Sequence, residues 1–237
     1  MKKILFIFLL FLIIRPASSQ PNIKSFNFGF EMGWGTYSMN ELKELNTVVL
    51  NNLPFPAKIV SDFPPYYYYK PMFVFEFNHS EFGAFITRQS SGSRISSRDY
   101  SGEYRFEIRT YAKSFGIHYL IKLNPGDLFE IGLYSDLGQY TSRLKVQESL
   151  ELFSEESLNE EYTFRTNSFF LEPGFSISCQ FRPVILQLTA GYNYEFSKKG
   201  LSANTIEMIN IHSGKRAKIS WDGFRAGASL YFCVSAK

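Results

Sequence analysis

The chain is poor in the residue types on which most enzymes and metal sites depend. Its 237 residues include two cysteines, Cys179 and Cys233, and three histidines, His79, His118 and His212. It contains no Gly-x-Ser-x-Gly nucleophile elbow and no glycine-rich phosphate loop. The histidines show no spacing typical of a metal site. The sequence therefore predicts a protein that is not an enzyme and has no cofactor and no metal ion.

Beyond its N-terminal region the chain also lacks a long apolar run. A transmembrane helix needs roughly twenty consecutive apolar residues, and only residues 4–14 come close. Lys2 and Lys3 precede this run, and the small residues Ala17, Ser18 and Ser19 follow it. This order is typical of a secretory signal peptide. Residues 1–19 are therefore predicted to be removed on export.

Net charge is missing from the predicted mature chain, residues 20–237. The whole chain carries 25 basic and 22 acidic residues, and removing Lys2, Lys3 and Arg15 leaves 22 basic ones. A neutral chain gives no electrostatic reason to expect nucleic acid as a partner. No linker or change of composition divides residues 20–237, so one domain is predicted.

The chain is rich in alternating apolar and polar residues. This alternation has a period of two residues. A β-strand has the same period, because its successive side chains point to opposite faces. In residues 186–196 one face carries Leu186, Leu188, Ala190, Tyr192, Tyr194 and Phe196, and the other carries Gln187, Thr189, Gly191, Asn193 and Glu195. Residues 26–34 and 224–234 repeat the pattern.

The polar face of these strands carries glycines and charges, which suits a narrow lumen surrounded by lipid. Aromatic residues make up 18% of the chain, and membrane barrels use them as girdles at both interfaces. The alternation predicts an all-β fold, an eight-stranded antiparallel up-and-down transmembrane β-barrel. The residues predicted to face the lumen are Glu31, Glu76, Glu130, Asp136, Glu172, Glu195 and Arg225, with Arg105, Arg109, His118 and Arg182 nearby.

The predicted connections between strands alternate in length. Ser38 followed by Glu41 is a capping-box signature, and it precedes a predicted amphipathic helix that ends near Leu50. The long connections are 35–71, which holds this helix, the Ser-Gly-Arg tract 90–98, the acidic and partly helical tract 144–161, and the polar loop 197–218. Long connections on one side and short turns on the other are typical of outer-membrane barrels, with both termini in the periplasm.

One predicted strand has two conflicting phases. Tyr104, Phe106 and Ile108 fix one phase, whereas Phe115 and Ile117 follow the opposite one. A single long strand with a β-bulge near residues 111–114 would reconcile them. The two cysteines are predicted to lie unpaired on strands six and eight, which are not neighbours.

The chain resembles the small porin-like outer-membrane β-barrel proteins of Bacteroidota over nearly all of its mature length. The resemblance is carried by segment 28–34 (FGFEMGW), the inserted helix with 38–42, the run 54–57, the segment 99–102 after the Gly-Ser-Arg tract, and the closing strand with 223–227. These motifs are architectural. The family implies a location in the cell outer membrane, insertion by the barrel-insertion machinery and no catalytic residues.

Several functions remain open at this stage. A lumen filled by side chains, with a structural role or a binding role through the outer loops, is the favoured prediction. A gated conduit for small solutes, a lipid-modifying enzyme that uses a histidine as base, and a secreted lipocalin-like carrier are the alternatives. Outer-membrane lipid and lipopolysaccharide are expected partners. The acidic tract 144–161 and the basic residues Lys215, Arg216 and Lys218 could meet lipopolysaccharide phosphates or an unknown extracellular ligand.

Overall fold

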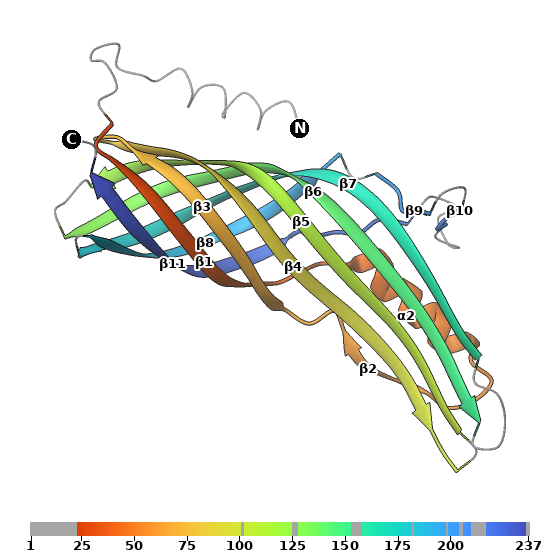
Figure 1. The fold of residues 1–237 in the computed structure, drawn as a ribbon. Helices are drawn as coiled ribbons and strands as arrows, with labels where there is room; N and C mark the ends of the chain where they lie inside the picture. The colour runs from red at the N-terminus through yellow and green to blue at the C-terminus, as the bar shows by residue number, and fades with distance from the viewer. Residues whose placement is uncertain are drawn as a thin grey trace.

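The computed structural model describes residues 23–100, 102–124, 128–152, 158–181, 183–197, 199–203, 206–209 and 217–235. These residues form one antiparallel sheet and one helix (Figure 1). The predicted signal peptide lies outside the described residues. The elements are β1 (Ser25–Gly35), α2 (Asn40–Asn52), β2 (Lys58–Asp62), β3 (Tyr66–Glu76), β4 (Ser80–Arg98), β5 (Gly102–Asn124), β6 (Phe129–Leu152), β7 (Leu158–Phe181), β8 (Val184–Phe196), β9 (Ser202–Ala203), β10 (Ile206–Glu207) and β11 (Gly223–Ser235).

Eight of these strands close into a ring. Their order around it is β1, β3, β4, β5, β6, β7, β8 and β11, and β11 pairs again with β1. Ser25 pairs with Ser235 and also with Glu76. The first strand therefore begins, and the last one ends, at the same end of the ring, here called the terminal end. The predicted eight-stranded antiparallel barrel is confirmed.

The apolar faces point outward, as the alternation predicts. On β8, Leu186 and Leu188 are exposed, whereas Gln187 and Asn193 are buried. A soluble carrier of the lipocalin type would show the reverse arrangement, because its apolar face has to line the interior. The lipocalin alternative therefore does not fit the observed wall.

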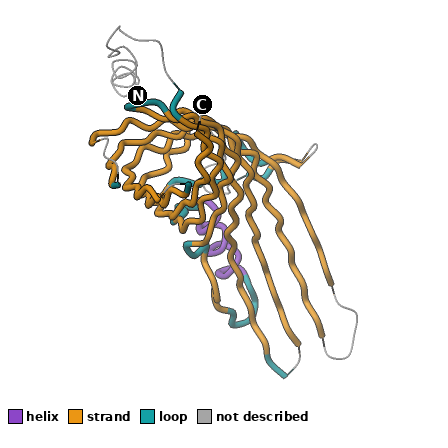
Figure 2. The backbone as a smooth tube through the Cα atoms, turned by 60° about the vertical axis from the view of Figure 1, so that its left-hand side comes forward, coloured by secondary structure: helices purple, strands orange, loops and turns teal. Residues whose placement is uncertain are grey.

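At the other end of the ring, the strands on one side extend much further than those on the opposite side. Strands β4 to β7 have 19, 23, 24 and 24 residues, whereas β1, β3, β8 and β11 have 11 to 13. The long strands continue past the ring as a curved wall (Figure 2). We call this the extended end. The predicted loop 90–98 and much of the tract 144–161 are wrong, because β4 reaches Arg98, β6 reaches Leu152 and β7 begins at Leu158.

The predicted β-bulge in 111–114 is also wrong. The pairing of β5 with β4 and with β6 runs without a register shift from Gly102 to Lys122. Tyr104, Ile108, Ser114 and His118 all lie on the inward face of one regular strand. The two phases in the sequence arise because polarity inverts along the strand. The inward face is polar inside the ring and apolar in the extended wall.

The inverted face is apolar because helix α2 packs against it. Met39 and Leu42 are fully buried in one hydrophobic cluster with Ile95, Ile108 and Leu144 from the wall. Full burial of a side chain the size of leucine stabilises a fold by about 1.5–3 kcal/mol. The polar face of the wall's strands is therefore the one left outside.

The predicted helix is confirmed, but its predicted capping box does not form. Met39 is the N-cap residue, with φ 45°, and no side chain caps the helix. Ser38 instead donates a hydrogen bond to Ser220, and Glu41 accepts one from the backbone N–H of Lys218. Asn46 binds Asp62 of β2 at 2.8 Å and accepts a bond from Ser93 of β4. These contacts fix the helix against the extended wall.

The two cysteines lie unpaired on separate strands, as predicted. Cys179 on β7 and Cys233 on β11 are both free, and β8 lies between their strands. In the part of the chain that the structure describes, no helix is long and apolar enough to cross a membrane.

Cysteine labelling can test the continuous phase of β5. In a Cys179→Ser, Cys233→Ser background, we expect Arg109→Cys to react readily with a hydrophilic maleimide and Ile108→Cys to react slowly. The reason is that Ile108 is buried and Arg109 is exposed on one unbroken strand. A bulge between this segment and the ring would exchange the two rates, so fast labelling at 108 with protection at 109 would contradict the assignment.

Candidate functional site

The interior of the ring is the part of the molecule that gathers chemically active side chains. The structure places all seven predicted lumen residues there, and none is more than 7% exposed. They come from six of the eight ring strands, namely Glu31, Glu76, Glu130, Asp136, Glu172, Glu195 and Arg225. An isolated buried charge is costly, so the partners of each group decide what the interior can do.

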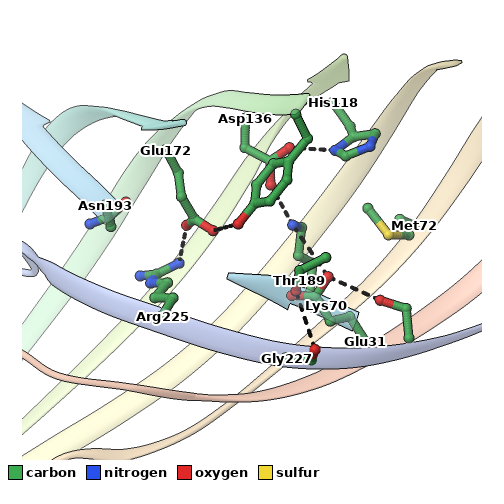
Figure 3. A network of polar contacts seen from close by, with 12 residues as sticks. Glu31, Lys70, Met72, His118, Asp136, Glu172, Thr189, Asn193, Arg225 and Gly227 are labelled. Atoms are coloured by element: carbon green, nitrogen blue, oxygen red, sulfur yellow. Dashed lines mark hydrogen bonds and ion pairs between the residues drawn. The ribbon is translucent and has the colours of Figure 1, made fainter. Parts of the chain in front are cut away.

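The centre of the interior is organised around Asp136 (Figure 3). One carboxylate oxygen of Asp136 contacts the ammonium of Lys70, and the other lies 2.5 Å from Nδ1 of His118. The same ammonium is 3.8 Å from Oε2 of Glu31. Glu31 also accepts hydrogen bonds from Tyr68 at 2.6 Å and from Ser229. Strands on opposite sides of the ring are thus joined through one chain of charges.

A second group surrounds Arg225 on β11. Its guanidinium donates to Glu172 at 2.9 Å, to Gln89 at 2.6 Å and to Tyr140 at 2.7 Å. Tyr134 donates to the other oxygen of Glu172. Arg225 therefore links β4, β6 and β7 to β11, and a planar guanidinium with several donors is suited to such multiple contacts.

A third group lies near the terminal end, where one cation faces three carboxylates. The ammonium of Lys122 is 2.7 Å from Glu76, 2.8 Å from Glu130 and 3.5 Å from Glu81. Glu76 also accepts hydrogen bonds from Ser25 and Asn27. This group is acidic overall, and it lies where β3, β4, β5 and β6 come together.

Glu195 holds the opposite end of the interior. It contacts the hydroxyl of Ser168 and accepts a hydrogen bond from the backbone N–H of Trp221 at 2.8 Å. The indole of Trp221 is fully buried and donates to Ser142. It also packs edge-on against Tyr37. An aromatic layer thus lies between the charged interior and helix α2.

Glycines on the inward faces make room for the tyrosines that cross the interior. A Cβ atom at Gly33 would lie 2.3 Å from the ring of Tyr68, and one at Gly174 would lie 2.4 Å from the ring of Tyr134. Such distances do not allow a side chain larger than hydrogen. The glycine-rich polar face seen in the sequence is therefore explained by packing.

Three important interior residues were missed at the sequence level. Lys70 escaped because the predicted strand began at residue 72, whereas β3 begins at Tyr66. Lys122 shares the inward phase of His118 and could have been found by extending that alternation. Glu81 was masked by its position at the start of a predicted strand.

Other predicted lumen neighbours lie elsewhere. Arg105 and Arg109 are wrong as interior residues, because both are exposed on the outer face of the extended wall. His118 does lie inside, whereas Arg182 and His212 fall outside the described residues. His79 lies in the turn between β3 and β4, where its carbonyl accepts a bond from the backbone N–H of Lys122.

The interior does not present an accessible catalytic arrangement among the described residues. His118 and Asp136 resemble the base and orienting carboxylate of a hydrolase, but both are at most 2% exposed. No group of three or more His, Cys, Asp or Glu residues in the described ranges is arranged to hold a metal ion.

Comparisons with known proteins find similarity to solved structures alone. No protein-family model matches the chain, and no curated protein matches it. Among solved structures, the major outer membrane protein of Thermus thermophilus is 13% identical, with 87% of this chain and 99% of that chain covered and a TM-score of 0.48.

Two further solved structures are also outer-membrane proteins. Ail of Yersinia pestis, in complex with the heparin analogue sucrose octasulfate, is 10% identical, with 89% of this chain and 100% of that chain covered and a TM-score of 0.42. The protease OmpT of Escherichia coli is 10% identical, with 92% and 98% covered and a TM-score of 0.38. Since every score is below 0.5, the barrel assignment rests on the strand pairing of this chain itself.

Removing the cation at the centre of the Arg225 group should destabilise the barrel strongly. Arg225→Met leaves Glu172 buried without a cation, which typically costs about 3–5 kcal/mol. We expect the double variant Arg225→Met, Glu172→Leu to regain much of that loss. The measurement is urea unfolding of the barrel in lipid vesicles.

The matched control is Arg109→Met, because Arg109 is exposed and such surface pairs contribute about 0–1 kcal/mol. A loss for Arg225→Met no larger than that of the control would show that the interior pair does not support the fold.

Proposed function

We propose that this protein is an integral outer-membrane β-barrel whose lumen is filled by its own side chains. Its role is structural, or one of binding through the parts that project outside the cell. It is neither a conduit nor an enzyme in this proposal. The observation that carries it is the combination of an apolar outer wall with a charged, paired interior.

The apolar outer wall extends around the whole ring. Each of the eight ring strands carries a large apolar side chain that is 40–65% exposed, represented by Phe28, Phe73, Ile86, Phe115, Phe129, Phe175, Leu188 and Phe232. A water-soluble monomer rarely exposes a continuous apolar surface of this extent. In a bilayer the same surface faces hydrocarbon, and closure of the sheet leaves no unpaired strand edge within the ring.

Aromatic residues support the position of this belt. Trp34, Tyr67, Tyr69, Tyr111 and Tyr192 are exposed on the outer wall toward the extended end. Tyrosine and tryptophan are enriched where a membrane meets water, because one end of each ring system is polar. The extended end then lies outside the cell, and the terminal end with its short turns lies in the periplasm.

The interior supports a filled lumen. The Lys122, Asp136 and Arg225 groups follow one another from the terminal end of the barrel toward the extended end, where the aromatic layer with Trp221 covers them. An eight-stranded barrel is only wide enough for side chains to fill. Continuous ion pairs from wall to wall oppose the passage of water and solutes.

The resemblance to the porin-like barrels of Bacteroidota is part of the proposal. It implies export through the predicted signal peptide of residues 1–19, delivery to the barrel-insertion machinery and residence in the cell outer membrane. Outer-membrane lipid and lipopolysaccharide are the proposed partners of the wall and of the parts outside.

Fractionation and conductance test the proposal together. The full chain should co-fractionate with outer membranes and migrate faster on a gel before boiling than after it, as folded barrels do. In planar bilayers it should give no steady conductance. Recovery in the soluble periplasmic or secreted fraction would refute the membrane assignment, whereas stable conductance steps would refute the filled lumen.

A matched pair of lysine substitutions on β7 tests which part of the wall faces lipid. Ile177 and Thr163 both point outward, but Ile177 lies in the apolar belt and Thr163 lies beyond it. Ile177→Lys should lower the free energy of unfolding in vesicles by about 2–4 kcal/mol, the usual cost of lysine near the bilayer midplane. Thr163→Lys should have little effect. Equal effects at the two positions would contradict the proposed belt.

A further inference from the structure

The outer wall of β4 to β7 changes abruptly from apolar to basic above the belt. Following the outward face of each strand from the terminal end, the first charged residue past the apolar run is Arg88 on β4, Lys113 on β5, Arg143 on β6 and Arg165 on β7. All four side chains are exposed. We call these four residues the cationic band.

The band contains like charges that face each other directly. Arg88 pairs in register with Lys113, and Arg143 pairs with Arg165. Like charges at directly opposite positions of an antiparallel pair are destabilising. Among the residues that the structure describes, none of the four forms an ion pair. An anion placed against the wall would remove this repulsion.

Basic residues continue above the band. Arg94 and Arg109 bind the carboxylate of Glu107 at 2.7 Å and 2.5 Å, and Arg105 beside them pairs with Glu103 at 2.6 Å. Burial alone would raise the pKa of Glu107, but the hydrogen bond from Arg109 and the three arginine charges lower it. Two carboxylates thus face three guanidinium groups. A recess of about 80 Å³ opens here, lined by Arg105, Glu107, Arg109, Gln147 and Ser149.

The strands β1, β3 and β11 on the opposite side of the ring lack this basic residue past the apolar run. On the opposite side, Thr36 follows the outward apolar run of β1. Asp222 precedes the outward apolar run of β11. The outward-facing tyrosines of β3 also end without a basic residue on that face of the strand. An even distribution would be expected if these charges served only solubility. A basic residue at the same place past the apolar run on four adjacent strands indicates one ligand-facing surface.

We propose that the cationic band binds the phosphate-bearing headgroups of lipids in the outer leaflet, held against the outer wall of β4 to β7. Ile86 and Phe115 lie one step below Arg88 and Lys113 on the same face, where acyl chains of the same lipids would pack. A soluble anion would gain nothing from that apolar surface. This inference rests on the proposed membrane location and identifies the lipid chemistry that the wall recognises.

Lipid binding by the full chain in nanodiscs tests the proposal. The discs contain phosphatidylcholine, and fluorescent diphosphoryl lipid A is the titrated probe. The variant Arg88→Gln, Lys113→Gln, Arg143→Gln, Arg165→Gln should bind the probe at least about tenfold more weakly, since each basic residue near an anionic lipid surface contributes substantially. Added salt should weaken wild-type binding more than binding by the variant.

The control variant removes the same charge elsewhere. Lys24→Gln, Lys58→Gln, Arg98→Gln, Lys218→Gln changes four exposed basic residues outside the band, and it should bind like the wild type. Equal binding by the band variant and the wild type would overturn the proposal. So would equally tight binding of soluble tripolyphosphate by the barrel in detergent, because that would indicate a general anion site.

Failure of this inference and failure of the proposed function give different results. A chain that does not insert into nanodiscs at all would refute the membrane barrel. A chain that inserts with its heat-modifiable mobility intact, but whose lipid A binding is unchanged by the four substitutions, would refute only the cationic band.

Discussion

Closure of the sheet between β1 and β11 is the constraint on which the rest of the structure depends. With the ring closed, no strand has an unpaired edge within the ring, and this part of the wall can face hydrocarbon without unsatisfied peptide groups. The polar half of every strand must then lie inside a ring of only eight strands. Charges that enter this narrow space require partners, and Lys70, Lys122 and Arg225 provide them from strands on different sides.

The same alternation has two different outcomes along β4 to β7. In the ring part of these strands, the outer face meets lipid and the inner face meets charged groups, so apolar residues point outward. In the extended wall, the outer face meets water and the inner face meets helix α2, so apolar residues such as Ile108 and Leu144 point inward. The inversion requires no change in backbone geometry. It also explains why one side of the ring carries both the helix and the basic outer surface.

Most of the barrel could be predicted from the sequence, because period-two alternation is unambiguous where lipid and lumen differ strongly. Strand ends were less predictable. The tract 90–98 reads as a loop by composition, yet Ser93 and Ile95 face helix α2 across a regular strand. The bulge on β5 was predicted because the sequence shows which residues are polar but does not show whether lipid, water or a helix covers each face of the strand. The seven predicted interior residues were found by phase, whereas Lys70 was missed because its strand begins six residues earlier than its aromatic alternation indicates.

The central claim is that the outer face of β5 meets lipid in the ring and water in the extended wall. Depth-dependent fluorescence quenching along β5 tests this claim most directly. A fluorophore would be attached to single cysteines at position 117 or 105 of the otherwise cysteine-free barrel in vesicles. The account predicts that brominated acyl chains quench the label at 117 and aqueous iodide quenches the label at 105. Quenching of position 117 by iodide, without quenching by the lipid, would contradict it.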